Sequence, residues 1–275
     1  MDNSRRKFLK LAGVSAIAGI AAPAAFNSLL KGEAFASGGG SGHGEDKAPT
    51  GKRYGFVVDV QKFAADKDLA QRCINACHTT HNVPDFGKDN KKDEIKWIWT
   101  ETFGHAFPDH SQYKKNTQLV DLPIMTFCNH CDNPPCVRAC PTKATFKNAD
   151  GMVLMDFHRC IGCRFCMAAC PYGARSFNWR NPAVKNEDGS YKYIRRPNLD
   201  FPTRMRGVVE KCNMCAERLA EGKQPACVDA CRPTDGIIFG DLNDPNSEVS
   251  KVLREKFTIQ RKPALGTKPS IFYII

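Results

Sequence analysis

The chain has 275 residues, of which 42% are hydrophobic, so it is long enough to bury a core without a dense framework of disulfides. Its formal net charge is +11, but no stripe of Lys or Arg alternates with aromatic residues. Such a stripe is expected of a nucleic-acid-binding surface, so this class of function has no support. The unusual feature is the cysteine content, fourteen residues, and the chemistry of the chain depends on what these thiols bind.

Residues 1–36 have the pattern of an export signal. Ser4–Lys10 (SRRKFLK) contains a twin arginine, an apolar run from Leu11 to Phe26 follows, and Ala34-Phe35-Ala36 is a cleavage site of the small-x-small type. The apolar run is shorter than the roughly twenty residues of a membrane span, and Pro23 interrupts it. Because the twin-arginine route carries folded proteins, this terminus predicts a periplasmic protein that folds before export.

A short repeated pattern follows a flexible linker at residues 37–52, which is rich in Gly, Ser and charged residues. Gly55–Val60 and Gly151–Phe157 each have the pattern of a short strand that ends at an aspartate before a cysteine-bearing segment. We expect Asp59 and Asp156 to cap the segments that follow them by accepting backbone hydrogen bonds.

Twelve of the cysteines fall into three arrays of four. The second array has the spacing C-x2-C-x2-C-x3-C-P, in which three thiolates surround one iron-sulfur cluster and the fourth binds a neighbouring cluster. A structural zinc site uses two separate pairs of ligands, so this spacing favours 4Fe-4S clusters. The arrays are Cys128, Cys131, Cys136 and Cys140; Cys160, Cys163, Cys166 and Cys170; and Cys212, Cys215, Cys227 and Cys231.

Two stretches interrupt the cysteine segments: residues 85–122 lie between Cys77 and the first array, and the polar residues 181–205 lie between the second and third arrays. The first contains Trp97 and Trp99 in an alternating pattern, which predicts a strand with one buried face and a packing role for both rings. The last residues, 268–275, are expected to form a final strand that completes the fold, with docking onto a membrane subunit as the alternative.

The sequence has none of the patterns expected of a substrate-converting site. It has no Gly-rich dinucleotide fingerprint, no nucleophile paired with a base, and no open metal site that we can identify. His130 and His158 lie beside cysteines, where hydrogen bonding is expected rather than ligation. We therefore expect no catalytic residues and no enzyme activity in this chain alone.

These motifs resemble those of the cluster-binding subunits of respiratory membrane complexes, of the polysulfide reductase and nitrite-reductase electron-transfer type. The resemblance rests on Cys128–Cys136, Cys160–Cys163 and Gly240–Pro245 and covers the chain from Arg53 to its end. The signal and an incomplete first motif make it most similar to the DsrO-type subunit of the sulfite-reduction-associated DsrMKJOP complex of sulfate reducers.

The resemblance implies an α+β fold of two fused bacterial ferredoxin-like modules with pseudo-twofold symmetry and loop insertions. The divisions expected after the signal and linker are an outer module formed by 53–84 with 206–245, an insertion at 85–122, an inner two-cluster module at 123–180, an insertion at 181–205, and a C-terminal helix and strand at 246–275.

The resemblance also implies that paired motifs exchange ligands between three 4Fe-4S clusters. The ligand sets are Cys128, Cys131, Cys136 and Cys170 for cluster 1; Cys160, Cys163, Cys166 and Cys140 for cluster 2; and Cys212, Cys215, Cys227 and Cys77 for cluster 3.

The first motif of the family is incomplete in this chain. Its spacing, counted back from Cys77, reaches Cys73 but then Ala70 and Lys67, so a fourth cluster would lack two thiolates. Cys73 and Cys231 are therefore expected to face each other, and an oxidising compartment would permit a disulfide between them. The segment Cys73–His78 also resembles a covalent haem site, but the common form has two residues between the cysteines and this one has three, which argues against haem.

The function implied by the resemblance is electron transfer. Electrons would pass between an integral membrane subunit that interacts with quinone and other redox subunits, including a multihaem cytochrome c, in a complex of sulfur metabolism. The subunit would attach to the membrane through a partner. The alternatives are a reductase with a catalytic cluster near the incomplete first motif, and a structural iron-sulfur protein that is redox-silent.

Overall fold

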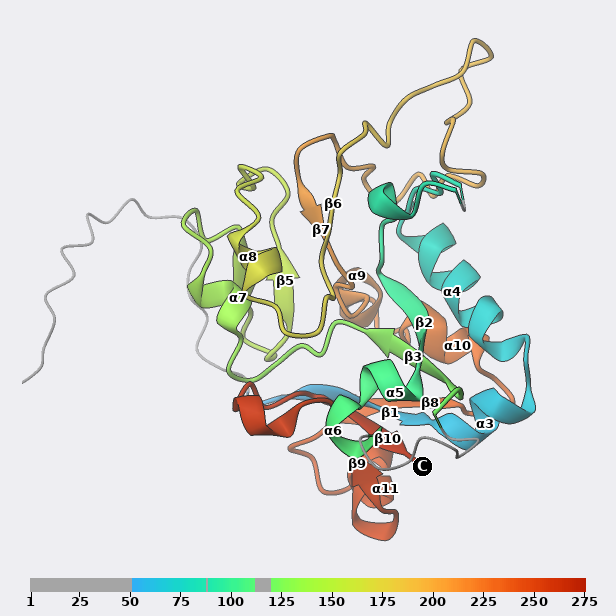
Figure 1. Cartoon of the computed structure of the whole chain (residues 1–275), viewed down its shortest axis with the longest axis vertical. Coiled ribbons are helices and arrows are strands. Elements are labelled where there is room, and N and C mark those ends of the chain that lie inside the picture. Colours follow the sequence, from blue (N-terminus) through green and yellow to red (C-terminus); the bar gives the residue numbers. More distant parts are fainter. Residues whose placement is uncertain (1–50, 88, 112–119) are drawn as a thin grey trace, which may run out of the picture. The chain divides into compact units, whose positions relative to one another are not determined.

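The computed structural model describes residues 51–87, 89–111 and 120–275, all within the compact unit Asp46–Ile275 (Figure 1). The predicted signal and almost all of the predicted linker lie outside these residues. The described helices are α3 (Val60–Ala65), α4 (Leu69–Thr80), η1 (Lys91–Asp93), α5 (Phe103–Ala106), α6 (Pro108–Ser111), α7 (Pro135–Arg138), α8 (Phe165–Ala168), α9 (Ala216–Ala220), α10 (Ala226–Ala230), α11 (Glu248–Glu255) and η2 (Pro263–Leu265). The strands are β1 (Tyr54–Asp59), β2 (Ile98–Thr102), β3 (Pro123–Phe127), β4 (Thr145–Lys147), β5 (Val153–Met155), β6 (Ser176–Phe177), β7 (Val209–Glu210), β8 (Ile237–Asp241), β9 (Thr258–Ile259) and β10 (Ile271–Ile274).

The largest sheet joins segments from the two ends of the described chain. Its strand order is β8-β1-β10-β9, with β1 antiparallel to β8 and parallel to β10. Strand β10 occupies an interior position, and Ile271 and Tyr273 on it are fully buried. The C-terminal residues therefore form the expected strand and complete the sheet.

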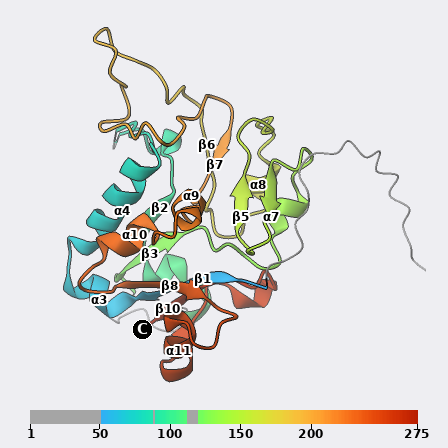
Figure 2. The same ribbon diagram turned by 180° about the vertical axis from the view of Figure 1, so that it is seen from behind.

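Two helices pack beside this sheet and belong to the same region. Helix α4 buries Leu69, Cys73 and Cys77, which recur every four residues and therefore lie on one face of the helix. This face packs against α10, and the two helices lie side by side in both views (Figures 1 and 2). We call β1, α3, α4, α10, β8 and β10 the outer region.

The second part of the fold is built from much smaller elements. Helices α7 and α8 have four residues each and contact one another, and the strands here form the two-stranded sheets β4-β5 and β6-β7. We call the segment from β4 to β6, together with α7 and the loop before it, the inner region.

The two repeated aspartates have the predicted capping role. Asp59 Oδ1 accepts hydrogen bonds from the backbone N–H groups of Gln61 and Lys62 at the start of α3. Asp156 Oδ1 accepts from His158 N and Arg159 N in the loop before the second cysteine array. Each strand is thereby followed by a fixed change of chain direction.

Trp97 is fully buried and belongs to the main apolar core. Its Nε1 donates a hydrogen bond to Glu210 Oε2 at 2.9 Å, and the buried Arg204 forms an ion pair with the same carboxylate at 2.6 Å. Trp99 packs beside the cysteines of the first array. Both tryptophans therefore have the predicted packing role.

The fold is α+β, with small sheets and short helices arranged as ferredoxin-like modules. Among the described residues, no helix combines the length and the apolar character that crossing a bilayer requires.

Candidate metal centres

Four cysteines from two arrays line a single cavity in the inner region. These are Cys128 and Cys131 in the loop after β3, Cys136 on α7, and Cys170 just after α8. All four are predicted ligands of cluster 1. Asn129 lines the same cavity, and both polar atoms of its buried side chain have no hydrogen-bond partner among the described residues.

A buried guanidinium lies between the first and second sets of cysteines. Arg175 is 5% exposed, and its Nη1 donates to Thr145 Oγ1 at 3.1 Å. Burial alone would lower the pKa of Arg175, but the neighbouring thiolates of Cys136 and Cys166 raise it. A fixed positive charge here offsets the negative charge that thiolate ligands bring into the interior.

The second set of cysteines adjoins the first through the contact between α7 and α8. Cys166 packs in one apolar cluster with Cys136, and Cys160 packs against that cluster. Cys140 accepts a hydrogen bond from Thr145 N at 3.5 Å. Cys140 and Cys163 are partly exposed, so this set lies nearer to solvent than the first.

The third set forms where α4 and α10 meet the loop before α9. Cys77 is buried next to Cys212, Cys215 and Cys227, and burial followed by these neighbours raises its pKa well above the ordinary value. Two backbone N–H groups donate to sulfur atoms of the set, Met214 N to Cys212 Sγ and Ala226 N to Cys215 Sγ, each at 3.4 Å. Bonds of this kind stabilise thiolates that ligate a metal.

Two buried side chains connect the first and third sets. Lys211 Nζ donates to Val153 O and, at 2.7 Å, to Cys212 O, while His130 Nδ1 accepts from Val153 N at 3.1 Å. Burial alone would raise the pKa of Cys128, but the charges of Lys211 and His130 lower it well below its ordinary value. The predicted hydrogen-bonding role of His130 is confirmed.

These contacts define a sequence of sites through the protein. Cys136 of the first set adjoins Cys166 of the second, and Cys128 of the first set adjoins Cys212 of the third. The first set is therefore central, and the second and third lie on either side of it.

The two cysteines left over from the arrays meet each other. Cys73 Sγ and Cys231 Sγ are 2.9 Å apart, and both residues are fully buried between α4 and α10. The predicted juxtaposition is confirmed. Both cysteines are free in the structure, so the disulfide stays a prediction.

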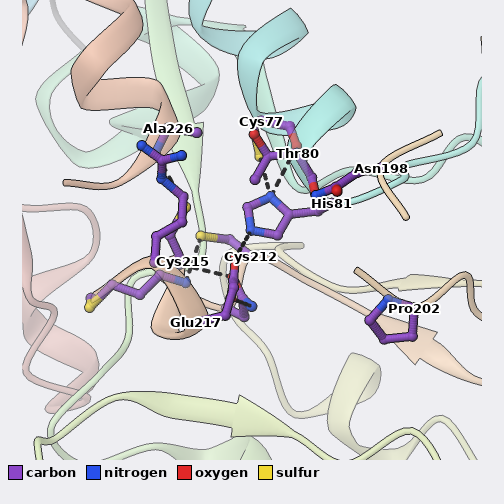
Figure 3. Close-up of polar contacts among 12 residues, drawn as sticks. Cys77, Thr80, His81, Asn198, Pro202, Cys212, Cys215, Glu217 and Ala226 are labelled. Atoms are coloured by element: carbon purple, nitrogen blue, oxygen red, sulfur yellow. Dashed lines mark hydrogen bonds and ion pairs between the residues drawn. The ribbon is translucent and has the colours of Figure 1, made fainter. Parts of the chain in front are cut away.

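No role was predicted for His81 from the sequence. It ends α4, is 1% exposed, and stacks on Trp97 with ring centroids 4.7 Å apart. Figure 3 shows its ring between Cys77 and Glu217, with Nε2 to Glu217 Oε1 at 2.7 Å and Nδ1 to Cys77 O at 3.0 Å. His81, Cys215 and Glu217 bring their ligand atoms within 4.8 Å of one another, at the edge of the third set. The only sequence signal was its position four residues after Cys77, on the same helical face.

The two cysteines considered for haem attachment lie in the apolar core and not at the surface. Cys73 contacts Cys231, Cys77 lies among the third set, and both belong to the main apolar core. Each thiol already has a cysteine neighbour from another segment of the chain, which argues against attachment of a haem to the pair.

The donor sets fit 4Fe-4S clusters. The first set offers four thiols around one cavity, the third offers four neighbouring thiols with N–H groups aimed at sulfur, and buried cations stand beside both. Soft thiolate ligands of this number and arrangement are those that iron-sulfur clusters require. The fold and the sites together define an iron-sulfur protein of the ferredoxin-like class.

Comparison with known proteins agrees with this class. Residues 122–198 and 197–242 match the family described as 4Fe-4S dicluster domain. The protein is 36% identical to "Hdr-like menaquinol oxidoreductase iron-sulfur subunit 1" of Archaeoglobus fulgidus, over 98% of its own length and 97% of that protein. It is 43% identical to a chain of the polysulfide reductase of Wolinella succinogenes, over 81% and 94% of the two lengths. It is 35% identical to "Protein NrfC" of Escherichia coli K12, over 82% and 81%. The chain belongs to this family of 4Fe-4S dicluster iron-sulfur subunits.

Proposed function

We propose that this chain is a periplasmic electron-transfer subunit that carries three 4Fe-4S clusters. Cys128, Cys131, Cys136 and Cys170 would hold cluster 1; Cys160, Cys163, Cys166 and Cys140 would hold cluster 2; and Cys77, Cys212, Cys215 and Cys227 would hold cluster 3. When bound, each cluster takes up and releases a single electron without making bonds to a substrate.

The observation that carries this proposal is the cavity lined by Cys128, Cys131, Cys136 and Cys170. Its ligands come from two arrays, as ligand exchange between paired motifs requires, and both neighbouring sets adjoin it. Because the first set contacts both of the other sets, an electron can pass through three adjacent centres from one end of the row to the other.

The two ends of the row offer different surfaces to redox partners. At the second set, Ile161 and Phe165 lie within the cysteine motif and are 67% and 60% exposed. At the third set, an open groove runs between α4 and α10, and Ala76 and Ala226 line it beside Cys77 and Cys227. Asn75, Arg218 and Asp229 also line this groove, so a partner would meet a mixed polar and apolar surface beside the third set.

The relatives support a place in a respiratory complex, since one is named as a menaquinol oxidoreductase subunit and another as part of a polysulfide reductase. We propose that the partners are an integral membrane subunit that interacts with quinone and a multihaem cytochrome c, in a complex of the DsrMKJOP type that serves sulfur metabolism. Attachment to the membrane is through the partner, after export by the twin-arginine route.

The catalytic alternative needs a site at the incomplete first motif that a substrate can reach. Cys73 and Cys231 are fully buried there and contact each other, which argues against it. A redox titration distinguishes the redox-silent alternative from electron transfer, because a redox-silent protein would show no reducible cluster.

The test is metal analysis followed by a redox titration of anaerobically purified protein. Three clusters require about twelve iron and about twelve acid-labile sulfide per chain. Electron paramagnetic resonance during the titration should show reducible clusters within the range of roughly −700 to +450 mV. Zinc in place of iron, or clusters that stay silent over this range, would overturn the proposal.

A further inference from the structure

We propose that Cys73 and Cys231 form a redox-active dithiol-disulfide pair in the place of a fourth cluster, and that the pair exchanges two electrons with the centre at Cys77, Cys212, Cys215 and Cys227. This inference rests on the proposed function, because the electron exchange needs a redox centre at the third set.

The first observation is the sulfur contact itself. The two Sγ atoms are 2.9 Å apart although the residues are 158 positions apart in the sequence. An S–S bond of about 2.05 Å therefore requires a shift of less than about 1 Å between the sulfur atoms. Packing of α4 on α10 has already brought the thiols together.

The second observation is the position of the pair relative to the third set. Cys73 lies one helical turn before Cys77 on α4, and Cys231 lies just after α10, four residues beyond Cys227. Four residues of helix span about 6 Å. Cys227 also acts electrostatically on Cys73, and Cys231 acts on Cys227, so the pair adjoins the third set from both helices.

Third, in the proposed ligand pattern, the pair stands where two ligands of a further cluster would be. Cys73 and Cys231 follow the same helical pattern as Cys166 and Cys140, which are proposed to share cluster 2 with two loop cysteines. In the first motif, Ala70 lies inside α4 where a loop cysteine would stand. Two thiols are too few for a cluster, but two thiols in contact are sufficient for a disulfide.

Because the pair is buried, an oxidant dissolved in the solvent cannot reach it. Both residues are 0% exposed and belong to the main apolar core, so a dissolved disulfide or thiol reagent has no access while α4 and α10 stay packed. The adjoining iron-sulfur centre is therefore the oxidant and reductant that the proposal names. This arrangement would make the pair a two-electron store at the end of a row of one-electron centres.

Oxidation of the pair balances in atoms and electrons. The S–H bonds of Cys73 and Cys231 break, one S–S bond forms, and two electrons leave one after the other to the third centre, which passes the first electron on to the neighbouring centre at Cys128, Cys131, Cys136 and Cys170 before it accepts the second. Two protons leave to solvent, and the exposed carboxylate of Asp235, whose charge acts on Cys231, is a nearby acceptor. The hydrogen bond from Cys73 lowers the pKa of Cys231, so the pair can lose its first proton from Cys231. Reduction reverses each step.

The experiment counts electrons and thiols in the same samples of full-length holoprotein. The dye-oxidised protein is titrated with reduced methyl viologen, then quenched in acid, alkylated with iodoacetamide and mapped by mass spectrometry. The wild type should take up about five electrons per chain, three for the clusters and two for the disulfide. The peptide joined through Cys73 and Cys231 should be present before the titration and absent after it.

The matched variants are Cys73→Ala, Cys231→Ala and the double variant. Each should take up about three electrons, because either substitution removes the whole two-electron reaction. In Cys77→Ala, which lacks a proposed ligand of the third centre, the disulfide should persist after the same viologen treatment.

Three outcomes would overturn the inference: uptake of about three electrons by the wild type, no joined peptide in the oxidised protein, or a joined peptide that survives reduction of the wild-type clusters. Iron and sulfide are measured on the same samples. If the three-cluster proposal is wrong, the iron content falls below about twelve per chain. If only the redox role of the Cys73–Cys231 pair is wrong, the iron content is about twelve, but the wild type takes up about three electrons, as the variants do.

Discussion

The inner and outer regions place cysteines in the same pattern but surround them differently. Cys136 and Cys140, like Cys166 and Cys170, are four residues apart on or next to α7 and α8, and so are Cys73 and Cys77 on α4. In the inner region α8 begins one residue before Cys166, and a loop before it carries two further cysteines. In the outer region α4 begins four residues before Cys73, so helix replaces the loop.

The difference is that Cys73 and Cys231 lie in an apolar core and not beside a cysteine-bearing loop. Leu69, in the first turn of α4, is fully buried and packs with Cys73 and Cys231 in the main core. The inner region has only four-residue helices and two-stranded sheets around its cysteines. We infer that metal ligation stabilises the inner region, whereas side-chain packing stabilises much of the outer region.

The largest expected effect comes from removing the metal. Chelation under reducing, anaerobic conditions should abolish amide protection in β4, β5 and β6, because ligation and folding are coupled there. Strands β1, β8 and β10 should keep part of their protection. Hydrogen exchange read by mass spectrometry tests this, and equal loss in both regions would remove the distinction between them.

The next effect isolates packing in the outer region. Ile271→Ala on β10 truncates a fully buried side chain and should lower the free energy of unfolding by about 2–5 kcal/mol. The control is Ile275→Ala, at a position that is 37% exposed, which should change it by less than about 0.5 kcal/mol. Denaturant unfolding of the holoprotein measures both. Equal effects at the two positions would contradict the interior place of β10.

Acid should also act on the outer region, through His78 on α4. Burial lowers the pKa of His78 from 6.5 to about 4. The unfolded chain therefore binds a proton that the folded chain excludes, so this contribution to stability is present above pH 6.5 and is lost as the pH falls towards about 4, by up to about 3 kcal/mol. In the variant His78→Leu the free energy of unfolding should fall less steeply over this window. Parallel pH profiles for the two proteins would exclude His78 as the cause.

The smallest effect concerns the buried cation between the two regions. Lys211→Met removes a positive charge beside Cys128 and Cys212, which should lower the reduction potentials of the adjoining centres by on the order of 100 mV, or about 2 kcal/mol. Lys223→Met, at an exposed position, should leave them unchanged because solvent screens its charge. A redox titration followed by electron paramagnetic resonance measures the shift, and equal potentials in the two variants would show that Lys211 does not tune the centres.

Much of the site could be predicted from the sequence because cluster ligands are spaced locally. The run from Cys160 to Pro171 identifies its cofactor class by itself, since the geometry of one loop decides which thiols can reach one cluster. The strands before the cysteine segments and their capping aspartates, Asp59 and Asp156, are equally local, and both are found as predicted.

Contacts between distant segments could not be predicted from the local spacing of residues in the sequence. The central place of the first set depends on how Cys136 meets Cys166 and how Cys128 meets Cys212. His81 acquires its role only when Glu217, 136 residues further along the chain, is brought to its ring. No local pattern encodes these neighbours, because they follow from the packing of helices and sheets whose sequences are far apart. The spacing of the cysteine arrays was enough to predict the class of cofactor, whereas the order of the three sets and the contact between Cys73 and Cys231 depend on how distant helices pack.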